Sequence, residues 1–190
     1  MGEETNALDP RQLDAYTQLA ATLTSDQAIA TLERTGAAGN ENPELFKRLG
    51  NLYFQSGDTQ RAERLYRRAI AVDPDNTQAH ANLGIILEAT GDLARARAAF
   101  ARASELAPLD PRYHGRLADL ARVAGDLPAA IGHYRRTLAL NPQDSAARTA
   151  YAEAVRRYGA AEAEQIGATA DLRALIDTGL DAARDIYRTY

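Results

Sequence analysis

The chain has 190 residues, a formal net charge of −4 and no cysteine. A negative net charge gives no general attraction to nucleic acid or to an anionic membrane, and the lack of cysteine excludes disulfides, thiol nucleophiles and thiolate metal sites. No apolar run approaches the roughly 18 residues of a membrane-spanning helix, and the opening MGEETNALDP has neither the basic nor the apolar region of a signal peptide. We therefore expect a cytoplasmic protein without membrane insertion.

The chain opens with two segments whose patterns are weak. Residues 1–8 form a polar tail. Residues 9–42 are similar to a degenerate helical hairpin, in which Ala28 and Leu32 fall in register with the hairpins further along the chain. Ser25 and Asp26 can cap its second helix.

Three regular repeats follow, at 43–76, 77–110 and 111–144, and a Gly-Asp pair divides each of them. A glycine can take the left-handed conformation that ends a first helix, and the aspartate can then cap a second helix. A proline near the end of each repeat stops the second helix. The residues that keep this 34-residue period include Gly57, Gly91 and Gly125, Leu49, Leu83 and Leu117, and Pro74, Pro108 and Pro142. A period of this length predicts stacked helical hairpins.

Small residues also recur in register inside the predicted helices. Gly50 and Gly84 occupy the position that Ala118 takes in the third repeat. A glycine inside a helix costs roughly 1 kcal/mol relative to alanine. Its recurrence therefore indicates that the two helices of a hairpin approach each other closely at this point.

Two helical segments are predicted after the repeats. Residues 145–158 (SAARTAYAEAVRRY) predict a helix that covers the exposed end of the third repeat, as the terminal units of stacked repeats must. Residues 159–190 comprise an Ala/Glu stretch between Gly159 and Gly167, which is either a short helix or a linker, and, from about residue 171, an amphipathic helix whose apolar stripe runs from Leu172 to Tyr190. This stripe can pack on the chain's own repeats, or it can bind a second copy or a partner.

The pattern of the repeats resembles that of the tetratricopeptide repeat family. This family places an aromatic residue, Leu-Gly and Tyr on the first helix, and Ala, an aromatic residue, Ala and Pro on the second. The first repeat carries the motif as Phe46, Leu49, Gly50, Tyr53, Ala62, Tyr66, Ala69 and Pro74. The position of Phe46 is taken by His80 and His114 in the next two repeats, where the resemblance implies packing between helices. It also implies an all-α, right-handed superhelical solenoid of antiparallel helix pairs.

A subset of this family, the co-chaperones of eukaryotic heat-shock chaperones, holds the carboxylates at the C-terminus of a peptide with residues from three successive first helices. The resemblance assigns this role to five residues, namely Lys47, Asn51, Asn82, Arg112 and Arg116. Arg112 departs from the pattern, because it stands where lysine is usual and puts a planar fork in place of a compact charge. Lys47 is the single lysine of the chain, whereas asparagine at the other two positions is common throughout the family.

The spacing of these residues suits the task. Side chains four residues apart share a helix face, so Lys47 and Asn51 point together, as do Arg112 and Arg116. Three cations and two amides offer hydrogen-bond donors to a dianionic peptide end. The alternative is a groove that binds some other extended segment or helix.

The sequence carries no recognisable catalytic or metal-binding constellation. It has three histidines and no two-histidine helical motif, so it offers no ligand set for zinc. Arginines crowd the second helix of the first repeat, where we expect a solvated face with nearby glutamate partners; they are Arg61, Arg64, Arg67 and Arg68. We therefore predict no enzyme activity, no cofactor, no metal and no nucleic acid partner.

The predicted function is a non-enzymatic protein–protein interaction module or adaptor. It binds an extended peptide in the concave groove that the first helices line, and the five residues above favour the acidic C-terminus of that peptide. The alternative function is an assembly factor or self-associating scaffold, with the C-terminal amphipathic helix as its contact surface.

Overall fold

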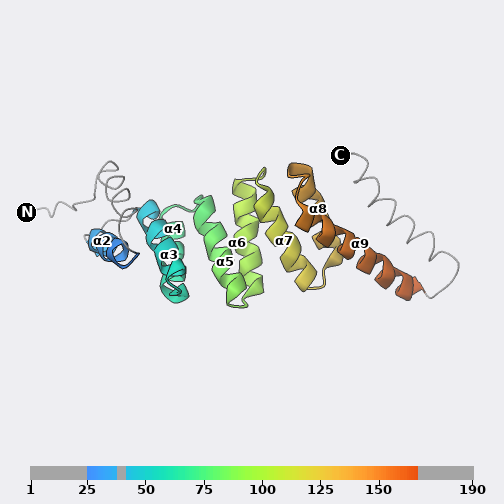
Figure 1. The fold of residues 1–190 in the computed structure, drawn as a ribbon, viewed down its shortest axis with the longest axis horizontal. Helices are drawn as coiled ribbons and strands as arrows, with labels where there is room; N and C mark the ends of the chain where they lie inside the picture. Colours follow the sequence, from blue (N-terminus) through green and yellow to red (C-terminus); the bar gives the residue numbers. More distant parts are fainter. Residues whose placement is uncertain (1–24, 38–41, 167–190) are drawn as a thin grey trace, which may run out of the picture. The chain divides into compact units, whose positions relative to one another are not determined.

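The computed structural model describes residues 25–37 and 42–166, with side chains at 27–33 and 42–160. Within these ranges every regular element is an α-helix (Figure 1), and none of these helices is long and apolar enough to cross a bilayer. The helices are α2 (Ser25–Ala37), α3 (Pro43–Gln55), α4 (Thr59–Val72), α5 (Thr77–Ala89), α6 (Leu93–Leu106), α7 (Pro111–Val123), α8 (Leu127–Leu140) and α9 (Ser145–Ile166). The polar tail, the first part of the 9–42 hairpin and the amphipathic helix from residue 171 lie outside the described residues.

The chain divides into two compact units, with the boundary between Leu106 and Ala107. In the first unit α2 packs on α3, α3 on α4, α4 on α5, and α5 on α6. In the second unit α7 packs on α8, and α8 on α9. The pairs α3–α4, α5–α6 and α7–α8 are antiparallel hairpins (Figure 1), which confirms the predicted all-α fold of helix pairs.

The Gly-Asp pairs form the turn inside each hairpin, as predicted. Gly57 has a backbone φ of +87°, in the left-handed region that glycine adopts without a steric penalty. The side chain of Asp58 accepts a hydrogen bond from the backbone N–H of Arg61 and so caps α4. The same geometry recurs at the pairs that begin with Gly91 and Gly125, where φ is +84° and +79°.

A second set of caps begins the first helix of each hairpin. In each case an Asn or Asp side chain accepts a hydrogen bond from a backbone N–H of the first helical turn. The capping residues are Asn42, Asn76, Asp110 and, for α9, Asp144. They lie 34 residues apart, so the repeat period also sets where each first helix begins.

The recurring small residues mark the contact between the two helices of a hairpin, as predicted. A Cβ added at Gly50 would lie 2.7 Å from Cε1 of Tyr66, and one added at Gly84 would lie 2.9 Å from Cζ of Phe100. A Cβ does not come this close to a non-bonded heavy atom, so a buried ring would have to move. The third hairpin has Ala118 at this position, where its methyl group is fully buried in the core.

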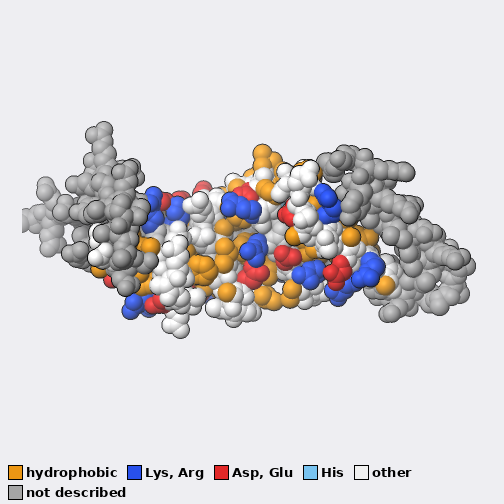
Figure 2. Space-filling model, in the orientation of Figure 1, with side chains coloured by type: hydrophobic (Ala, Val, Ile, Leu, Met, Phe, Trp, Pro, Cys, Tyr) orange, Lys and Arg blue, Asp and Glu red, His pale blue; other side chains and the backbone are white. Residues whose placement is uncertain are grey.

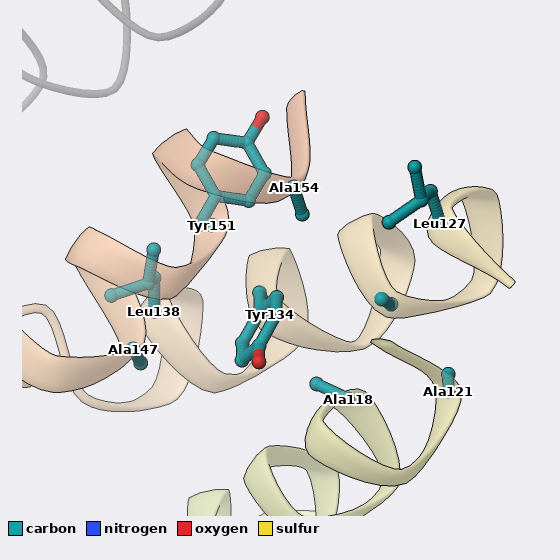
Figure 3. Close-up of a cluster of buried hydrophobic side chains, with 9 residues drawn as sticks. Ala118, Ala121, Leu127, Tyr134, Leu138, Ala147, Tyr151 and Ala154 are labelled. Carbon is teal, nitrogen blue, oxygen red and sulfur yellow. The ribbon is translucent and has the colours of Figure 1, made fainter. Parts of the chain in front are cut away.

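The core of the second unit lies around α8 (Figure 3). Tyr134 and Leu138 of α8 share one buried cluster with Tyr151 and Ala154 of α9. α9 therefore covers an apolar face of α8 that would otherwise meet solvent.

α9 is longer than the helix predicted there, which ends at residue 158, because it continues to Ile166. The helix passes through Gly159, which costs roughly 1 kcal/mol at a helix interior. The sequence that follows is AAEAEQ, and its alanines and glutamates are strong helix formers that offset this cost.

Candidate functional site

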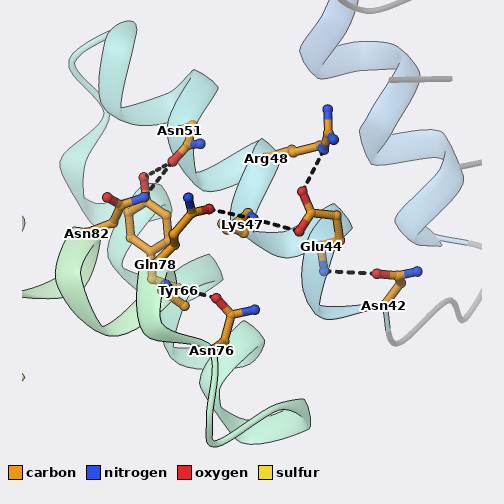
Figure 4. Close-up of polar contacts among 10 residues, drawn as sticks. Asn42, Glu44, Lys47, Arg48, Asn51, Tyr66, Asn76, Gln78 and Asn82 are labelled. Atoms are coloured by element: carbon orange, nitrogen blue, oxygen red, sulfur yellow. Dashed lines mark hydrogen bonds and ion pairs between the residues drawn. The ribbon is translucent and has the colours of Figure 1, made fainter. Parts of the chain in front are cut away.

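Lys47 lies on α3, and its ammonium group contacts one side chain of its own helix and one of α5 (Figure 4). Its Nζ donates a hydrogen bond to Oε1 of Gln78 on α5, at 2.7 Å, and pairs with Oε2 of Glu44 at 2.6 Å. Only 14% of the Lys47 side chain is exposed. An ammonium has three N–H donors, so these two contacts leave one donor for an incoming acceptor.

Glu44 anchors this cation and also accepts a hydrogen bond from Nε of Arg48, at 2.9 Å. Burial raises the pKa of the Glu44 carboxyl, but the hydrogen bonds from Lys47 and Arg48 outweigh burial and hold its pKa below the ordinary value. Glu44 is therefore ionised at neutral pH and forms an ion pair with Lys47. The i, i+3 spacing of the pair is visible in a sequence, yet the predicted site omitted Glu44.

The two asparagines of the predicted site touch each other directly. Oδ1 of Asn51 on α3 accepts hydrogen bonds from Nδ2 of Asn82 on α5, at 2.8 Å, and from the hydroxyl of Tyr66, at 2.6 Å (Figure 4). Burial raises the pKa of Tyr66 to about 12, so the phenol stays a donor at neutral pH. The Nδ2 group of Asn51 and the carbonyl of Asn82 take no part in these two bonds and can meet a peptide backbone.

A small pocket of about 90 Å³ adjoins these amides. It combines aromatic, aliphatic and amide groups and is lined by Asn51, Phe54, Gln55, Tyr66, Asn82 and Ile85. Phe54 is 39% exposed although it is large and apolar. The pocket therefore offers an apolar contact next to hydrogen-bonding amides, a combination that suits a small side chain of a bound peptide.

In the second unit, α7 carries both predicted arginines, four residues apart on one helix face. Arg112 forms a two-point contact with Asp110, at 2.7 Å from Nη2 to Oδ2 and 3.0 Å from Nε to Oδ1. The hydrogen bond from Arg112 is the main reason that the pKa of Asp110 lies below its ordinary value. The Arg112 side chain is nevertheless 76% exposed, and Arg116 is exposed as well.

The five predicted residues thus fall into two groups. Lys47, Asn51 and Asn82 belong to the first unit, where α3 and α5 are joined by the bond from Lys47 to Gln78 and by the bond between the two asparagines. Arg112 and Arg116 belong to the second unit. The sequence analysis did not predict the contact of Lys47 with Gln78, or that of Arg112 with Asp110, which caps α7.

A related hydrogen-bond network lies in the second unit. The hydroxyl of Tyr134 donates to Oδ1 of Asp119, at 2.6 Å, and accepts from Nε of Arg122, at 3.2 Å. Asp119 stands two repeat periods after Asn51, and the position between them is Ile85. Tyrosine therefore pairs with a polar residue in the first and third hairpins.

In the middle hairpin, Phe100 stands where the other two hairpins have this tyrosine. Its partner position is the aliphatic Ile85. Phe100 has no hydroxyl to donate, and Ile85 has no side-chain acceptor, so both members of the hydrogen-bonded pair are absent in this hairpin.

Two histidines of the second unit stack on each other. The rings of His114 and His133 have centroids 6.1 Å apart and planes inclined by 25°. Nε2 of His114 lies 3.3 Å from the carbonyl oxygen of Pro108, just as Nε2 of His80 lies 2.9 Å from that of Pro74. Donation to this carbonyl leaves the buried Nδ1 of His114 with no hydrogen-bond partner among the described residues.

We expect the second unit to lose stability as the pH falls from 7 to 5. Burial, and then the neighbouring His114, lower the pKa of His133 below its ordinary value of 6.5. The unfolded chain therefore takes up this proton at a higher pH than the folded chain, so acid favours unfolding. Melting temperatures measured across this range should fall, and should fall less in the variant His133→Gln. An equal fall in both proteins would contradict the assignment to His133.

The described residues form no large patch of a single charge on the face shown in Figure 2. On the face shown in Figure 2, acidic and basic side chains lie next to each other along the described helices. No group of three or more potential metal-binding side chains occurs within 25–37 and 42–166.

Comparison with known proteins gives one family match. The family model described as Tetratricopeptide repeat matches residues 47–111 and 89–145, which together cover just over half of the chain. No curated protein shows significant similarity to the chain over its sequence.

Several solved structures share the fold at low sequence identity. A crystal structure of MamA protein has a TM-score of 0.73 and 19% identity, and the match covers 99% of this chain and 92% of that one. A second MamA structure has a TM-score of 0.66, 22% identity and coverage of 95% and 99%. The first tetratricopeptide repeat domain of Spaghetti (RPAP3), bound to the HSP90 peptide SRMEEVD, has a TM-score of 0.58, 21% identity and coverage of 62% and 93%.

Proposed function

We propose that this chain, which belongs to the tetratricopeptide repeat family, is a non-enzymatic adaptor that binds an extended peptide along the first helices of its hairpins. The tetratricopeptide repeat fold is a scaffold for protein–protein interaction. Repeats of this kind present long, continuous surfaces because each unit contacts mainly its neighbours. Here the first helices are α3, α5 and α7.

The ligand that we propose is the acidic carboxyl terminus of a partner protein. The observation that carries this proposal is the ammonium of Lys47, which is held by Glu44 and Gln78 and retains one donor, on a side chain that is only 14% exposed. A carboxylate that reaches this donor forms a charge-assisted hydrogen bond, and such bonds contribute roughly 1.5–3 kcal/mol. Asn51 and Asn82 add polar groups that can hold the peptide backbone.

Arg112 and Arg116 complete the proposed donor set from the second unit. Their assignment rests on sequence register with the family's carboxylate-binding residues and on their shared face of α7. A ligand has to share the guanidinium of Arg112 with Asp110. We expect this sharing to make Arg112 the weaker contributor of the two.

The peptide in the RPAP3 structure supports this choice of ligand class, because SRMEEVD ends in an aspartate and has two glutamates just before the final Val-Asp. The same peptide is a suitable first probe for this chain. It is not offered as the natural partner.

We expect SRMEEVD with a free C-terminus to bind about tenfold or more tightly than the same peptide with a C-terminal amide. Amidation removes one negative charge and replaces an acceptor oxygen with a donor, and the lost charge-assisted bond exceeds the roughly 1.4 kcal/mol that a factor of ten represents. Isothermal titration calorimetry at low salt measures both affinities. Equal affinities would show that the carboxylate is not recognised, and the proposal would then be wrong.

The second predicted function, a self-associating scaffold, depends on residues 171–190, which lie outside the described residues. No observation among the described residues favours it. We therefore retain the peptide-binding adaptor alone.

A further inference from the structure

A second surface lies on the first unit, where α2 and α4 both pack on α3. A cavity of about 430 Å³ opens there. Phe46, Leu49 and Tyr53 of α3 form part of its lining, and each is at most 5% exposed. Leu65 of α4 and Glu33 of α2 also line it. The cavity therefore has an apolar floor made of core residues, and none of the five proposed peptide-binding residues lines it.

α4 presents a stripe of arginines along this cavity, made of Arg61, Arg64 and Arg68. Their i, i+3, i+7 spacing puts them on one helix face. Arg61 pairs with Asp58, at 3.3 Å between Nε and Oδ2. Neither Arg64 nor Arg68 has a carboxylate partner in the part of the chain that the structure describes.

The remaining arginine of α4 behaves differently. Arg67 pairs with Glu63 on the same helix, at 2.7 Å, as expected for a solvated face with glutamate partners. Arg64 and Arg68 are also exposed, as expected for a solvated face. They lack the expected glutamate partners, because α4 supplies only one glutamate for four arginines. Two guanidinium groups are thus left at the rim of an apolar cavity.

The Phe46 ring holds the Arg68 side chain in place but does not neutralise its charge. Its guanidinium carbon lies 4.3 Å from the centroid of the Phe46 ring, a cation–π contact that uses the flat face of the guanidinium. The N–H donors lie in the plane of the group and remain available to an acceptor. Arg61 lies over Tyr53 in a similar way, at 5.2 Å.

We propose that this cavity is a docking site for an acidic amphipathic helix of a protein partner. Arg64 and Arg68 are one helical turn apart, about 6 Å along the axis, and two carboxylates four residues apart on a partner helix have the same spacing. The apolar side chains of the partner helix then enter the cavity that residues of α2, α3 and α4 line, as in other helix-in-groove complexes. Charge complementarity selects an anionic partner, and the apolar floor selects a peptide over an inorganic anion.

The test uses the full chain and a fluorescent synthetic peptide of four helical turns, with leucine on one face and glutamate on the adjacent face. The peptide is acetylated and amidated, so it has no terminal carboxylate for the proposed peptide site. We expect saturable binding at low salt that the double variant Arg64→Glu/Arg68→Glu weakens by about tenfold or more. The matched control is Arg67→Glu, which makes the same kind of charge change on the same helix and should alter the affinity far less than the double variant.

Two further measurements separate this site from non-specific attraction. A peptide with lysine in place of glutamate should bind the double variant more tightly than it binds the unmodified chain. Circular dichroism should show that all variants keep their helical content. No saturable binding, or equal weakening by Arg67→Glu, would overturn the proposal. Tighter binding of single-stranded RNA through Arg64 and Arg68 would also overturn it, in favour of a nucleic acid site.

Discussion

Replacement of Tyr66 with alanine is expected to lower the free energy of unfolding by about 3–5 kcal/mol. Tyr66 is 1% exposed and packs with Leu45, Leu49 and Tyr53 in the core of the first unit. Truncation leaves a cavity beside the backbone of Gly50, because that glycine has no side chain with which to fill the space. Denaturant unfolding followed by circular dichroism measures the loss.

The variant Tyr66→Phe separates the ring from its hydroxyl. It keeps the packing and removes one hydrogen bond to Asn51, which retains its bond from Asn82. We expect a loss of roughly 0.5–1.5 kcal/mol. A loss of this size in the alanine variant as well would show that the ring contributes little packing, contrary to the structure.

Replacement of Lys47 with alanine is expected to weaken the binding of a free-acid peptide by about 2–5 kcal/mol. Only 14% of the Lys47 side chain is exposed, so water screens its attraction to a ligand carboxylate less than it would for a fully exposed lysine. Its removal also leaves Glu44, whose pKa is lowered, close to the incoming negative charge. Calorimetric titration of the same peptide into both proteins measures the difference.

Arg48 provides a matched control for this change. It is the next residue on α3 and it also pairs with Glu44, at 2.9 Å, but 37% of its side chain is exposed. The variant Arg48→Ala removes the same charge from the same helix and should cost less than about 1 kcal/mol of binding free energy. Similar losses in the two variants would indicate a general charge effect in place of a specific contact with Lys47.

The turns and helix contacts of this fold are predictable from sequence because they depend on local chemistry. Gly57 requires a positive φ that few other residues adopt, and Asp58 caps the helix that follows. Gly50 indicates the close approach to α4 because a glycine inside a helix needs a compensating contact. The sequence left the stretch after Gly159 open as a short helix or a linker. It did not predict that this stretch continues α9, because the gain from the alanines that follow is spread over many residues.

The candidate site was less predictable, because its contacts join residues that are distant in the sequence. The register placed Lys47 and Asn51 on one helix face. It gave no sign that Gln78 would reach Lys47 from α5, or that His133 would stack on His114. Such contacts depend on the rotamers of long side chains, and these are set by packing after the helices form.

The hydrogen bonds of Tyr66 with Asn51 and of Tyr134 with Asp119 limit how residues can be transferred from one hairpin to another. In the middle hairpin both members of the pair differ, because the corresponding positions hold Ile85 and Phe100. An asparagine grafted at position 85 would bring a carbonyl that in the first hairpin accepts a phenol proton, and phenylalanine has none to give. In each hairpin the residue on the first helix and the buried ring on the second helix therefore have to be exchanged together.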